Sequence, residues 1–507
     1  MHPISHAAIT PGKPACIMAR SGAQLTYAEL DARADQGARL FRGLGLNRGD
    51  VVAVMLTNGF DMFEIAWATQ RAGLYLTCVS TSASASDLAY ILQDSGARIL
   101  VASNEYEGVA ATALAASQAQ GFLASHAAGT LPNWRDTRGV MPAGPIPDPL
   151  PGADMLYSSG TTGRPKGVKP PLPDGALDAP TPLTAMGQSL YAMGPDMRYL
   201  STSPLYHAAP LRWAMTVHRL GGSVVIMEQF DAASALGLIE DHAITHATWV
   251  PTHFVRMLKL PDDIRARHDY RSLRAVIHAA APCPVAVKQA MIDWWGPIVH
   301  EYYSGTEGCG ITALSSAEWL AHPGSVGRAV LGTPHIVDDG GVELAAGLTG
   351  NVWFEGGLQF EYHNDPAKTA EAHDHRGWAT MGDIGRLDAD GYLYLSDRKS
   401  FMIISGGVNI YPQEIENLLV THPRVADAAV FGVPDEEMGE RVVAVVEPAD
   451  RADAGDDFAG ELSRFVRAAL GAIKAPKHIA VAEKLPREPT GKLLKRKLQV
   501  RYRDAGR

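Results

Sequence analysis

The sequence predicts a mixed α/β fold with two doubly wound layers, followed by a smaller α+β region towards the C-terminal end. Three observations support this prediction. Short apolar runs alternate with amphipathic stretches up to about residue 330, which is typical of parallel β-α units. Beyond residue 350 the pattern changes to short alternating runs, which is typical of hairpins and meanders. The chain has 507 residues, 46% of them hydrophobic and 20% charged, which is enough for several packed units.

The first layer is expected up to about residue 150. Apolar runs at 51–55 and 98–101 predict buried strands, and the Ala-rich stretch from Tyr27 to Gly45 predicts an amphipathic helix. Residues 142–151 and 170–182 each contain five prolines. These two segments are therefore expected to be loops that flank the segment between them.

The second layer is expected from about 185 to 330, where the runs 222–227 and 274–278 predict buried strands. Further on, the turn signal at 388–391 leads into Tyr392-Leu393-Tyr394-Leu395 and predicts a hairpin or meander. Two last strands and a helix predict a small α+β domain at 425–432, 440–447 and 457–472.

Composition and charge exclude several functional classes. The 45 basic and 55 acidic residues give a formal net charge of −10, which offers no overall positive field for nucleic acid or anionic lipid. No stretch approaches the ~20 apolar residues of a membrane span, and the first residues lack the regions of a signal peptide. Four separated cysteines, without a C-x-x-C pair, favour neither a zinc site nor a disulfide framework. We expect a cytoplasmic protein with no integral membrane segment and no nucleic-acid partner.

The most informative motif is Tyr157-Ser158-Ser159-Gly160-Thr161-Thr162-Gly163-Arg164-Pro165-Lys166-Gly167-Val168. Glycines give backbone freedom, hydroxyls and amides give hydrogen-bond donors, and two cations follow, which together suit a polyphosphate. It is not a Walker A loop, because Pro165 and Gly167 stand where that motif requires Gly and Ser or Thr.

This stretch closely resembles the phosphate-binding signature of the acyl-adenylate-forming superfamily, which includes acyl-CoA synthetases, peptide-synthetase adenylation domains and firefly luciferase. Other signatures follow in the expected order, so the resemblance covers nearly the whole chain. It implies that ATP is bound by this loop, with Thr161 also catalytic and near the metal. The residues implied in phosphate binding are Ser158, Ser159, Gly160, Thr161, Thr162, Gly163 and Lys166.

Two further segments resemble the nucleotide-binding motifs of the superfamily. In the segment 301–308, a lone Thr-Glu pair would by itself indicate only a solvated loop. The resemblance implies Tyr302 and Tyr303 near the adenine, Thr306 near the α-phosphate, and Glu307 as a catalytic residue that helps to hold Mg²⁺. It also implies nucleotide binding by Glu301 and by the small-residue loop Ala280, Ala281 and Pro282, whose alternative is a buried strand end.

The resemblance also defines a ribose site and a hinge. Asp383 is implied to accept hydrogen bonds from the ribose hydroxyls, and Arg398 to contact ribose or phosphate, although a structural ion pair is the common alternative. Two residues later the superfamily places a hinge, usually Asp or Lys, where this chain has Ser400. We expect residues 1–397 to form an adenylation region of two doubly wound subdomains with a small β-barrel-like portion, and residues 398–507 a mobile α+β lid.

The lid carries two more motifs. Ser405, Gly406 and Gly407 resemble the loop that lines the pantetheine tunnel of CoA ligases, although a tight turn before a helix would explain them equally well. Lys492 matches the mobile catalytic lysine, whose ammonium group would stabilise the charge of the adenylation transition state. The other cations between 492 and 503 indicate a solvated helix face.

The acyl pocket is expected near Ser203-Pro204-Leu205-Tyr206-His207-Ala208-Ala209-Pro210, where His207 borders the pocket by resemblance. Small residues such as Gly308 favour a bulky acid. Arg212 could instead pair with a second carboxylate, although a position at the rim of the core is the stronger interpretation. The other candidates for the wall are Trp213, Trp249 and Phe254.

These features together predict a two-step ligase that uses ATP, Mg²⁺ and coenzyme A to convert an aromatic, phenylpropenoid, steroid-side-chain or fatty acid into its thioester. An adenylation enzyme that loads a carrier-protein thiol is the first alternative, and a luciferase-like oxidation has no specific support. A non-catalytic sensor is disfavoured because it would need neither Lys492 nor Glu307. The exact acid and a homodimeric state stay open.

Overall fold

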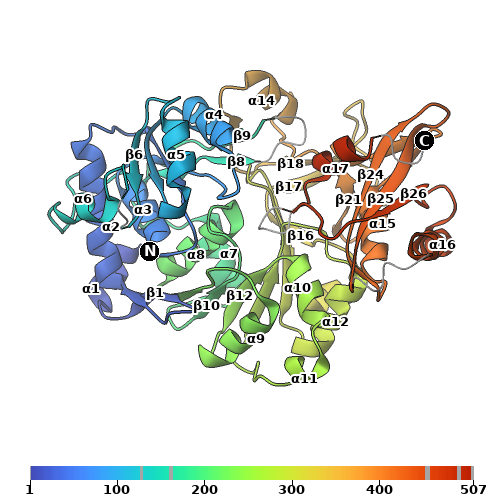
Figure 1. The fold of residues 1–507 in the computed structure, drawn as a ribbon, viewed down its shortest axis with the longest axis horizontal. Helices are drawn as coiled ribbons and strands as arrows, with labels where there is room; N and C mark the ends of the chain where they lie inside the picture. Colours follow the sequence, from blue (N-terminus) through green and yellow to red (C-terminus); the bar gives the residue numbers. More distant parts are fainter. Residues whose placement is uncertain (1, 126–128, 159–163, 451–456, 488–492, 504–507) are drawn as a thin grey trace.

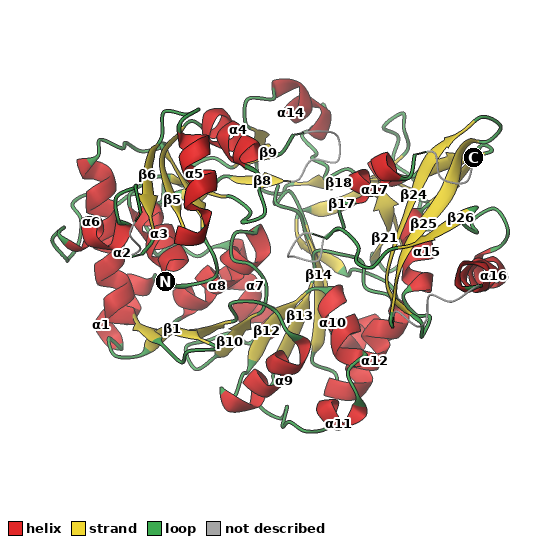
Figure 2. Cartoon of the chain, in the orientation of Figure 1, coloured by secondary structure: helices red, strands yellow, loops and turns green. Residues whose placement is uncertain are grey.

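The computed structural model describes residues 2–125, 129–158, 164–450, 457–487 and 493–503. Within these ranges the strands form five sheets, and the helices pack around them (Figures 1 and 2). The fold therefore confirms the predicted mixed α/β class with a separate C-terminal domain. Every helix of the described part is too short or too polar to span a membrane.

The first layer is a parallel sheet in the order β6-β5-β3-β4-β7. The apolar run 51–55 is β3, at its centre, as predicted. The predicted helix ends at Gly43 and starts at a capping box formed by Thr26 and Glu29. The strands are β3 (Val51–Met55), β4 (Tyr75–Cys78), β5 (Ala97–Ala102), β6 (Gln120–Leu123) and β7 (Ala153–Asp154); the helices are α2 (Tyr27–Gly43), α3 (Phe60–Arg71), α4 (Ala85–Ser95), η1 (Asn104–Tyr106), α5 (Glu107–Leu114) and α6 (Trp134–Gly139).

The second layer is a larger sheet in the order β16-β15-β14-β13-β12-β10-β11-β1-β2. Six neighbouring strands, from β14 to β1, are parallel, and the edges are antiparallel. Its strands are β1 (Pro14–Met18), β2 (Gln24–Thr26), β10 (Arg198–Ser201), β11 (Ser223–Ile226), β12 (His246–Trp249), β13 (Ala275–His278), β14 (Val299–Tyr303), β15 (Ile311–Leu314) and β16 (Arg328–Leu331). Its helices are α1 (Pro3–Ile9), α7 (Pro182–Tyr191), α8 (Ala208–Leu220), α9 (Ala232–Asp241), α10 (Pro251–Leu258), α11 (Asp262–Arg265), α12 (Val285–Trp295) and α13 (Ser316–Ala321).

This sheet corrects one expectation, because the second layer does not begin at residue 185. Strand β1 comes from the N-terminal end of the chain and pairs in parallel with β11, with Cys16 opposite Val224. The chain thus enters the second layer first, leaves it to build the first layer, and returns (Figure 1). Local patterns could not show this pairing because it joins segments about 200 residues apart.

Two small antiparallel sheets form the predicted barrel-like portion. One has the order β17-β18-β20-β21 and the other the order β19-β9-β8. The hairpin expected near 388–391 joins β20 to β21. The elements are β8 (Leu156–Ser158), β9 (Lys166–Lys169), β17 (Thr333–Val337), β18 (Gly350–Glu355), β19 (Glu361–Tyr362), α14 (Pro366–Ala372), β20 (Asp383–Leu387) and β21 (Leu393–Arg398).

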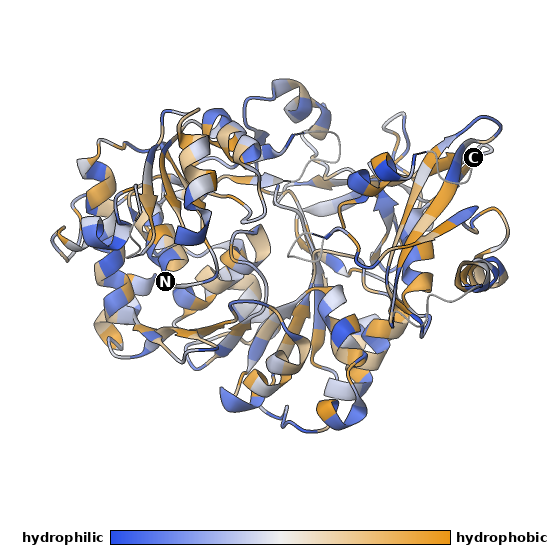
Figure 3. Ribbon diagram, viewed as in Figure 1, coloured by the Kyte–Doolittle hydropathy of each residue, from blue (hydrophilic) through white to orange (hydrophobic). Residues whose placement is uncertain are grey.

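The C-terminal domain has its own apolar core, which lies between its sheet and helices α15 and α16 (Figure 3). Strands β24 and β25 form a long antiparallel pair, and β26 joins β25 in parallel. The Lys259 ammonium group donates to the Val425 carbonyl, and Lys399 Nζ lies 2.7 Å from Asp339 Oδ1; both contacts join the C-terminal part of the chain to the rest of the molecule. The elements are η2 (Lys399–Phe401), β22 (Ile403–Ser405), β23 (Val408–Ile410), α15 (Pro412–Leu419), β24 (Val425–Asp435), β25 (Gly439–Pro448), α16 (Phe458–Leu470), β26 (His478–Val481) and α17 (Lys495–Arg501).

Candidate active site

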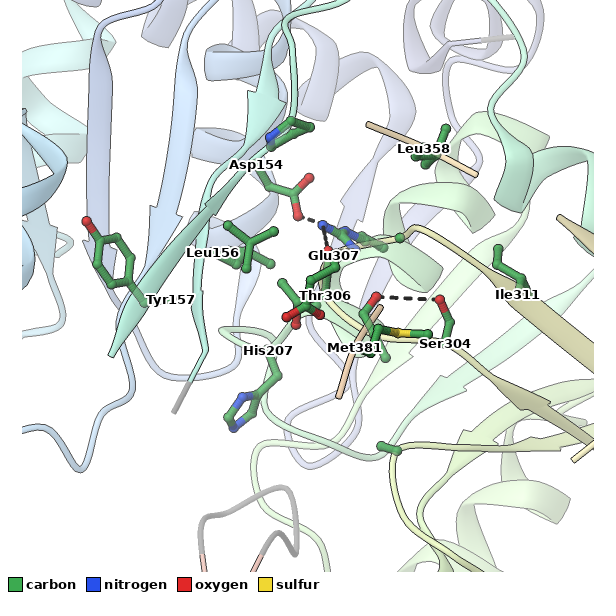
Figure 4. Close-up of a pocket in the computed structure, with 18 of the residues that line it drawn as sticks. Asp154, Leu156, Tyr157, His207, Ser304, Thr306, Glu307, Ile311, Leu358 and Met381 are labelled. Carbon is green, nitrogen blue, oxygen red and sulfur yellow. Dashed lines mark hydrogen bonds and ion pairs between the residues drawn. The ribbon is translucent and has the colours of Figure 1, made fainter. Parts of the chain in front are cut away.

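A cavity of about 1600 Å³ lies where the two layers, the small sheets and the C-terminal domain meet. Figure 4 shows Thr306 and Glu307 between Asp154 on one side and His207 on the other. Many of the predicted site residues line this cavity. They are Lys166, His207, Trp213, Trp249, Ala280, Ala281, Tyr302, Thr306, Glu307, Gly308, Asp383, Arg398 and Ser400.

The loop after β14 is fixed from the opposite side of the cavity. Arg212 donates through both terminal nitrogens to the Thr306 carbonyl, at 3.2 and 3.3 Å, and through Nε to Asp154 Oδ2 at 2.8 Å. Because α8 carries Arg212 and β7 carries Asp154, this chain of contacts ties both layers to the loop. Arg212 therefore holds the position of Thr306 and Glu307.

Glu307 has a partner that sequence reasoning missed. The Tyr362 hydroxyl, at the end of β19, donates to Glu307 Oε1 at 2.9 Å. Burial, together with the neighbouring Glu307 charge, raises the pKa of Tyr362, so this hydroxyl stays protonated as a donor. Among the described residues no donor contacts the other oxygen of Glu307. A carboxylate that lines the cavity supplies the hard oxygen ligand that Mg²⁺ prefers, so the site fits that ion.

The structure brings Asp383 and Arg398 together. They are direct partners in the β20–β21 pair, with Arg398 Nε 3.4 Å from Asp383 Oδ1. The Tyr303 hydroxyl donates to Asp383 Oδ2 at 2.5 Å. Burial raises the pKa of Asp383, although the charge of Arg398 opposes this effect. The two residues form an ion pair, and both also line the cavity. The structure is therefore compatible with a structural ion pair and with the predicted role in ribose binding.

Three residues that were predicted to bind the nucleotide do not line the cavity. They are Glu301, Tyr303 and Pro282. Glu301 is buried, and its Oε2 accepts from Lys288 Nζ at 2.6 Å and lies 3.4 Å from His278 Nε2. Lys288 is on α12, so this ion pair fastens β14 to the helix behind it. The Glu301 carboxylate is bound to Lys288 and does not line the cavity, so direct nucleotide contact by Glu301 stays a prediction.

Part of the phosphate signature lies outside the described residues, namely Ser159, Gly160, Thr161, Thr162 and Gly163. Ser158 ends strand β8. After the signature, Lys166 Nζ lies 2.5 Å from Asp365 Oδ2, and Asp365 also caps the N-terminus of α14. Lys166 lowers the pKa of Asp365, which keeps the pair ionised.

Of the two motifs predicted in the C-terminal domain, only the segment around Lys492 contributes described residues to the cavity wall. Lys492 lies outside the described residues, but Leu494 and Lys497 line the cavity shortly after it. Before it, Arg487 forms a bidentate pair with Asp427, and a β-bridge joins Arg487 to Leu493. The turn with Ser405, Gly406 and Gly407 is not part of the cavity wall, and both glycines have positive φ angles, of 56° and 77°.

Most of the residues predicted to form the acyl pocket line the cavity, and one does not. His207, at the N-terminal end of α8, and Trp213, Trp249 and Gly308 line the cavity. Phe254 does not; it is fully buried beside Trp249, with ring centroids 6.4 Å apart. Because Arg212 is paired with Asp154, its charge is already compensated by a residue of the protein.

Comparison with known proteins identifies the relatives of the chain. The model of the AMP-binding enzyme family matches residues 5–361, and that of the AMP-binding enzyme C-terminal domain matches residues 414–492. The long-chain-fatty-acid–CoA ligase FadD13 of Mycobacterium tuberculosis is 32% identical over 511 residues, 98% of this chain and 97% of that protein. A feruloyl-CoA synthase of Amycolatopsis sp is 32% identical over 503 residues, 99% of this chain and 98% of that protein. The ATP-bound structure of MatB from Rhodopseudomonas palustris superposes with a TM-score of 0.84 at 28% identity, and covers 100% of both chains.

Proposed function

The chain belongs to the AMP-binding enzyme family, and from that premise we propose that it is an ATP-dependent carboxylate–CoA ligase for a bulky hydrophobic acid in the cytoplasm. One observation carries the proposal. A single cavity joins the charged residues Glu307, Asp383 and Arg398 to an apolar side that contains Trp213 and Trp249. A nucleotide and a hydrophobic acid could therefore meet at Thr306, between the two sides.

In the first half-reaction, a carboxylate oxygen of the acid attacks the α-phosphorus of ATP, and the bond to the bridging oxygen of pyrophosphate breaks. The products are acyl-AMP and pyrophosphate. The carboxylate is already ionised at neutral pH, so His207 is needed as part of the pocket wall and not as a base. Asp383 would bind the ribose hydroxyls, and Arg398 the ribose or a phosphate.

Charge stabilisation in this step would come from two sides. A magnesium ion bound by Glu307 and the phosphates would neutralise developing negative charge. Thr306 would contact the α-phosphate, and the ammonium group of Lys492 would approach it from the lid. Tyr362 and Arg212 would keep Glu307 and Thr306 in position through the contacts described above.

In the second half-reaction, the thiolate of CoA attacks the carbonyl carbon of acyl-AMP, the bond to the phosphate oxygen breaks, and AMP leaves. We propose that the lid rotates about Ser400 before this step and brings the Ser405–Gly407 turn to the pantetheine arm. That turn does not line the cavity in this arrangement, so the tunnel function requires it to move.

The cavity favours a hydrophobic acid over a diacid. Arg212, the cation considered for a second carboxylate, is compensated by Asp154 at 2.8 Å. A second carboxylate at that position would have to compete with this pair. The aromatic side chains on the wall suit the fatty, aromatic or steroid-side-chain acids expected from the sequence.

The decisive experiment is AMP release from ATP and Mg²⁺, with and without CoA, over a panel of acids. The panel contains acetate, malonate, octanoate, palmitate, benzoate, cinnamate, ferulate and a bile acid. CoA-dependent turnover with a hydrophobic class supports the proposal. Acyl-AMP that accumulates without CoA-dependent turnover would instead favour transfer to a carrier-protein thiol.

Two variants separate the half-reactions. Lys492→Ala should slow adenylation on the order of a hundredfold or more, because an electrostatic contact of the transition state is lost. Gly407→Leu should slow thioester formation while adenylation continues. Gly407→Ala is its matched control, since both variants place a side chain at the same positive φ but only leucine adds bulk. If Gly407→Leu slowed both half-reactions equally, the tunnel assignment would be wrong.

A further inference from the structure

The cavity continues from the reaction end into a chamber that follows one face of α8. Its lining includes Ala208, Arg212, Met215 and Arg219, at spacings of four, three and four residues. Residues at these spacings lie in one row along a helix. The chamber therefore extends along most of the length of α8, from His207 at its N-terminal end to Arg219 near its C-terminal end.

The opposite wall comes from the first layer. It is formed by Ala66, Thr69 and Gln70 on one face of α3, and by Leu76 and Cys78 on β4. The chamber thus lies between α3 and α8, which belong to different layers of the fold. This wall is distinct from the nucleotide side of the cavity, which is built by Glu307, Asp383 and the lid.

The proline-rich loop 170–181 also lines the chamber and is held at several points. Arg219 donates to the carbonyls of Leu177 and Ala179 at 3.1 and 3.4 Å. The Tyr75 hydroxyl donates to the Pro170 carbonyl at 2.7 Å, and Arg48 donates to the Pro173 carbonyl at 2.8 Å. We call this segment the roof loop; its anchors keep it over the chamber.

The chemistry of the chamber changes along its length. Ala66, Leu76 and Met215 make its middle apolar, whereas Thr69, Gln70 and Thr216 make its far end polar. The hydroxyls of Thr69 and Thr216 donate to helix carbonyls at 2.8 Å, so their oxygens remain as acceptors. Gln70 Oε1 accepts from Arg219 at 3.4 Å, and no described residue accepts from the Gln70 amide nitrogen. The far end thus combines acceptors with the Gln70 amide donor, which suits a hydroxyl or keto oxygen; the Arg219 guanidinium at this end is already bound to the Leu177 and Ala179 carbonyls and to Gln70 Oε1.

The length of α8 sets the length of the ligand that the chamber can hold. Thr216 and Arg219 lie nine and twelve residues beyond His207, which corresponds to about 14 and 18 Å at the rise of an α-helix. Carbon–carbon bonds of ~1.5 Å at tetrahedral angles advance an extended chain by about 1.25 Å per atom, so this span corresponds to roughly 11 to 14 carbon atoms.

We propose that this chamber binds the distal part of an elongated acid, about 11 to 14 carbons in extended length, which carries a hydroxyl or keto oxygen at its far end. The proposal rests on the proposed ligase function and narrows its substrate class. The carboxylate would react at the His207 end of the chamber, next to Thr306, the apolar body would pass Met215, and the distal oxygen would bind near Gln70.

The first test blocks the chamber at its middle. In Met215→Trp, the ratio of kcat/KM for dodecanoate to that for octanoate should fall at least about tenfold, because an eight-carbon chain ends before Met215 and a twelve-carbon chain passes it. Met141→Trp, at a partly buried methionine that does not line the cavity, is the matched control and should leave this ratio unchanged. An equal loss for both acids in Met215→Trp would overturn the proposal.

The second test addresses the polar end. The wild-type protein should prefer 12-hydroxydodecanoate or 12-oxododecanoate to dodecanoate, and Gln70→Leu should reduce this preference by about three- to tenfold, the effect of one hydrogen bond. Gln36→Leu serves as control, since Gln36 bonds to the Met141 carbonyl outside the cavity. A preference for plain dodecanoate would overturn the proposal. Turnover of octanoate without dodecanoate would refute the chamber alone, whereas the absence of CoA-dependent AMP release with every acid would refute the ligase function and the chamber with it.

Discussion

The contact between Tyr362 and Glu307 gives a sharp test of the proposed magnesium site. Tyr362→Phe removes one hydroxyl, which donates to Glu307 Oε1 at 2.9 Å, and leaves the ring in place. A hydrogen bond to a charged group contributes about 1.5–3 kcal/mol, and about 1.4 kcal/mol corresponds to a tenfold change in affinity. Loss of a residue that orients a metal ligand typically weakens metal binding about 10- to 100-fold. We therefore expect a 10- to 100-fold rise in the free Mg²⁺ concentration needed for half-maximal activity.

The assay is pyrophosphate release at fixed, saturating acid and ATP while free Mg²⁺ is varied. Tyr394→Phe is the matched control, because the Tyr394 hydroxyl also bonds to a carboxylate, Asp388 Oδ2 at 3.1 Å, but does not line the cavity. This control should keep the Mg²⁺ dependence of the wild-type protein. The reasoning is refuted if Tyr362→Phe lowers the maximal rate but leaves the Mg²⁺ dependence unchanged, or if both variants shift it equally.

Three further predictions follow from buried groups. Tyr303→Phe removes the donor to Asp383 and should raise the KM for ATP about tenfold with a smaller change in kcat; a fall in kcat alone would contradict it. Arg487→Met breaks the partly buried pair with Asp427 beside the segment that carries Lys492, and should slow adenylation about tenfold and lower the free energy of unfolding by about 2 kcal/mol in denaturant titrations. Burial lowers the pKa of His253 to about 3, against about 6.5 unfolded, so this residue alone should contribute about 2 kcal/mol to the stability lost between pH 6.5 and pH 5. In His253→Phe, the free energy of unfolding should fall less steeply with decreasing pH, by the slope that corresponds to one proton. If the slope of this variant equals that of the wild-type protein, His253 does not contribute to the dependence.

The sequence predicted the elements that carry the chemistry better than the contacts that support them. Strand 51–55, the loops rich in proline and the hairpin at 388–391 follow from local patterns, and the structure has all of them. The supporting partners are distant in the chain: Arg212 and Asp154 are 58 residues apart, Tyr362 and Glu307 are 55 apart. No local periodicity contains such pairs.

One of these partners, Tyr362, did leave a trace in the sequence. Tyr362 precedes Asp365 and Pro366, an N-cap followed by proline, which is a helix start that could have been predicted. The chemical role of the segment could not, because it depends on Lys166, 199 residues away from Asp365. Glu301 shows the opposite case: its position in a recognised motif suggested nucleotide contact, but burial against Lys288 satisfies its charge elsewhere.

The unusual residue at the hinge can be assessed from the contacts around it. Ser400 lies in η2 (Lys399–Phe401), and its neighbour Lys399 pairs with Asp339 through side chains that are 54% and 84% exposed. An ion pair this exposed contributes little to stability, so this pair beside Ser400 would offer little resistance to rotation of the proposed lid. We infer that serine permits rotation as readily as the usual aspartate or lysine.

A proline at this position should separate the two half-reactions. Helical φ angles are close to those that proline imposes, so Ser400→Pro fits the arrangement in which Leu494 and Lys497 face the cavity, and it restricts departure from it. Adenylation should continue, and thioester formation should fall at least about tenfold in single-turnover assays with preformed acyl-AMP. Ser400→Ala, which removes the hydroxyl but leaves φ unrestricted, should slow neither step. Equal loss of both half-reactions in Ser400→Pro would mean that the lid does not turn at this residue.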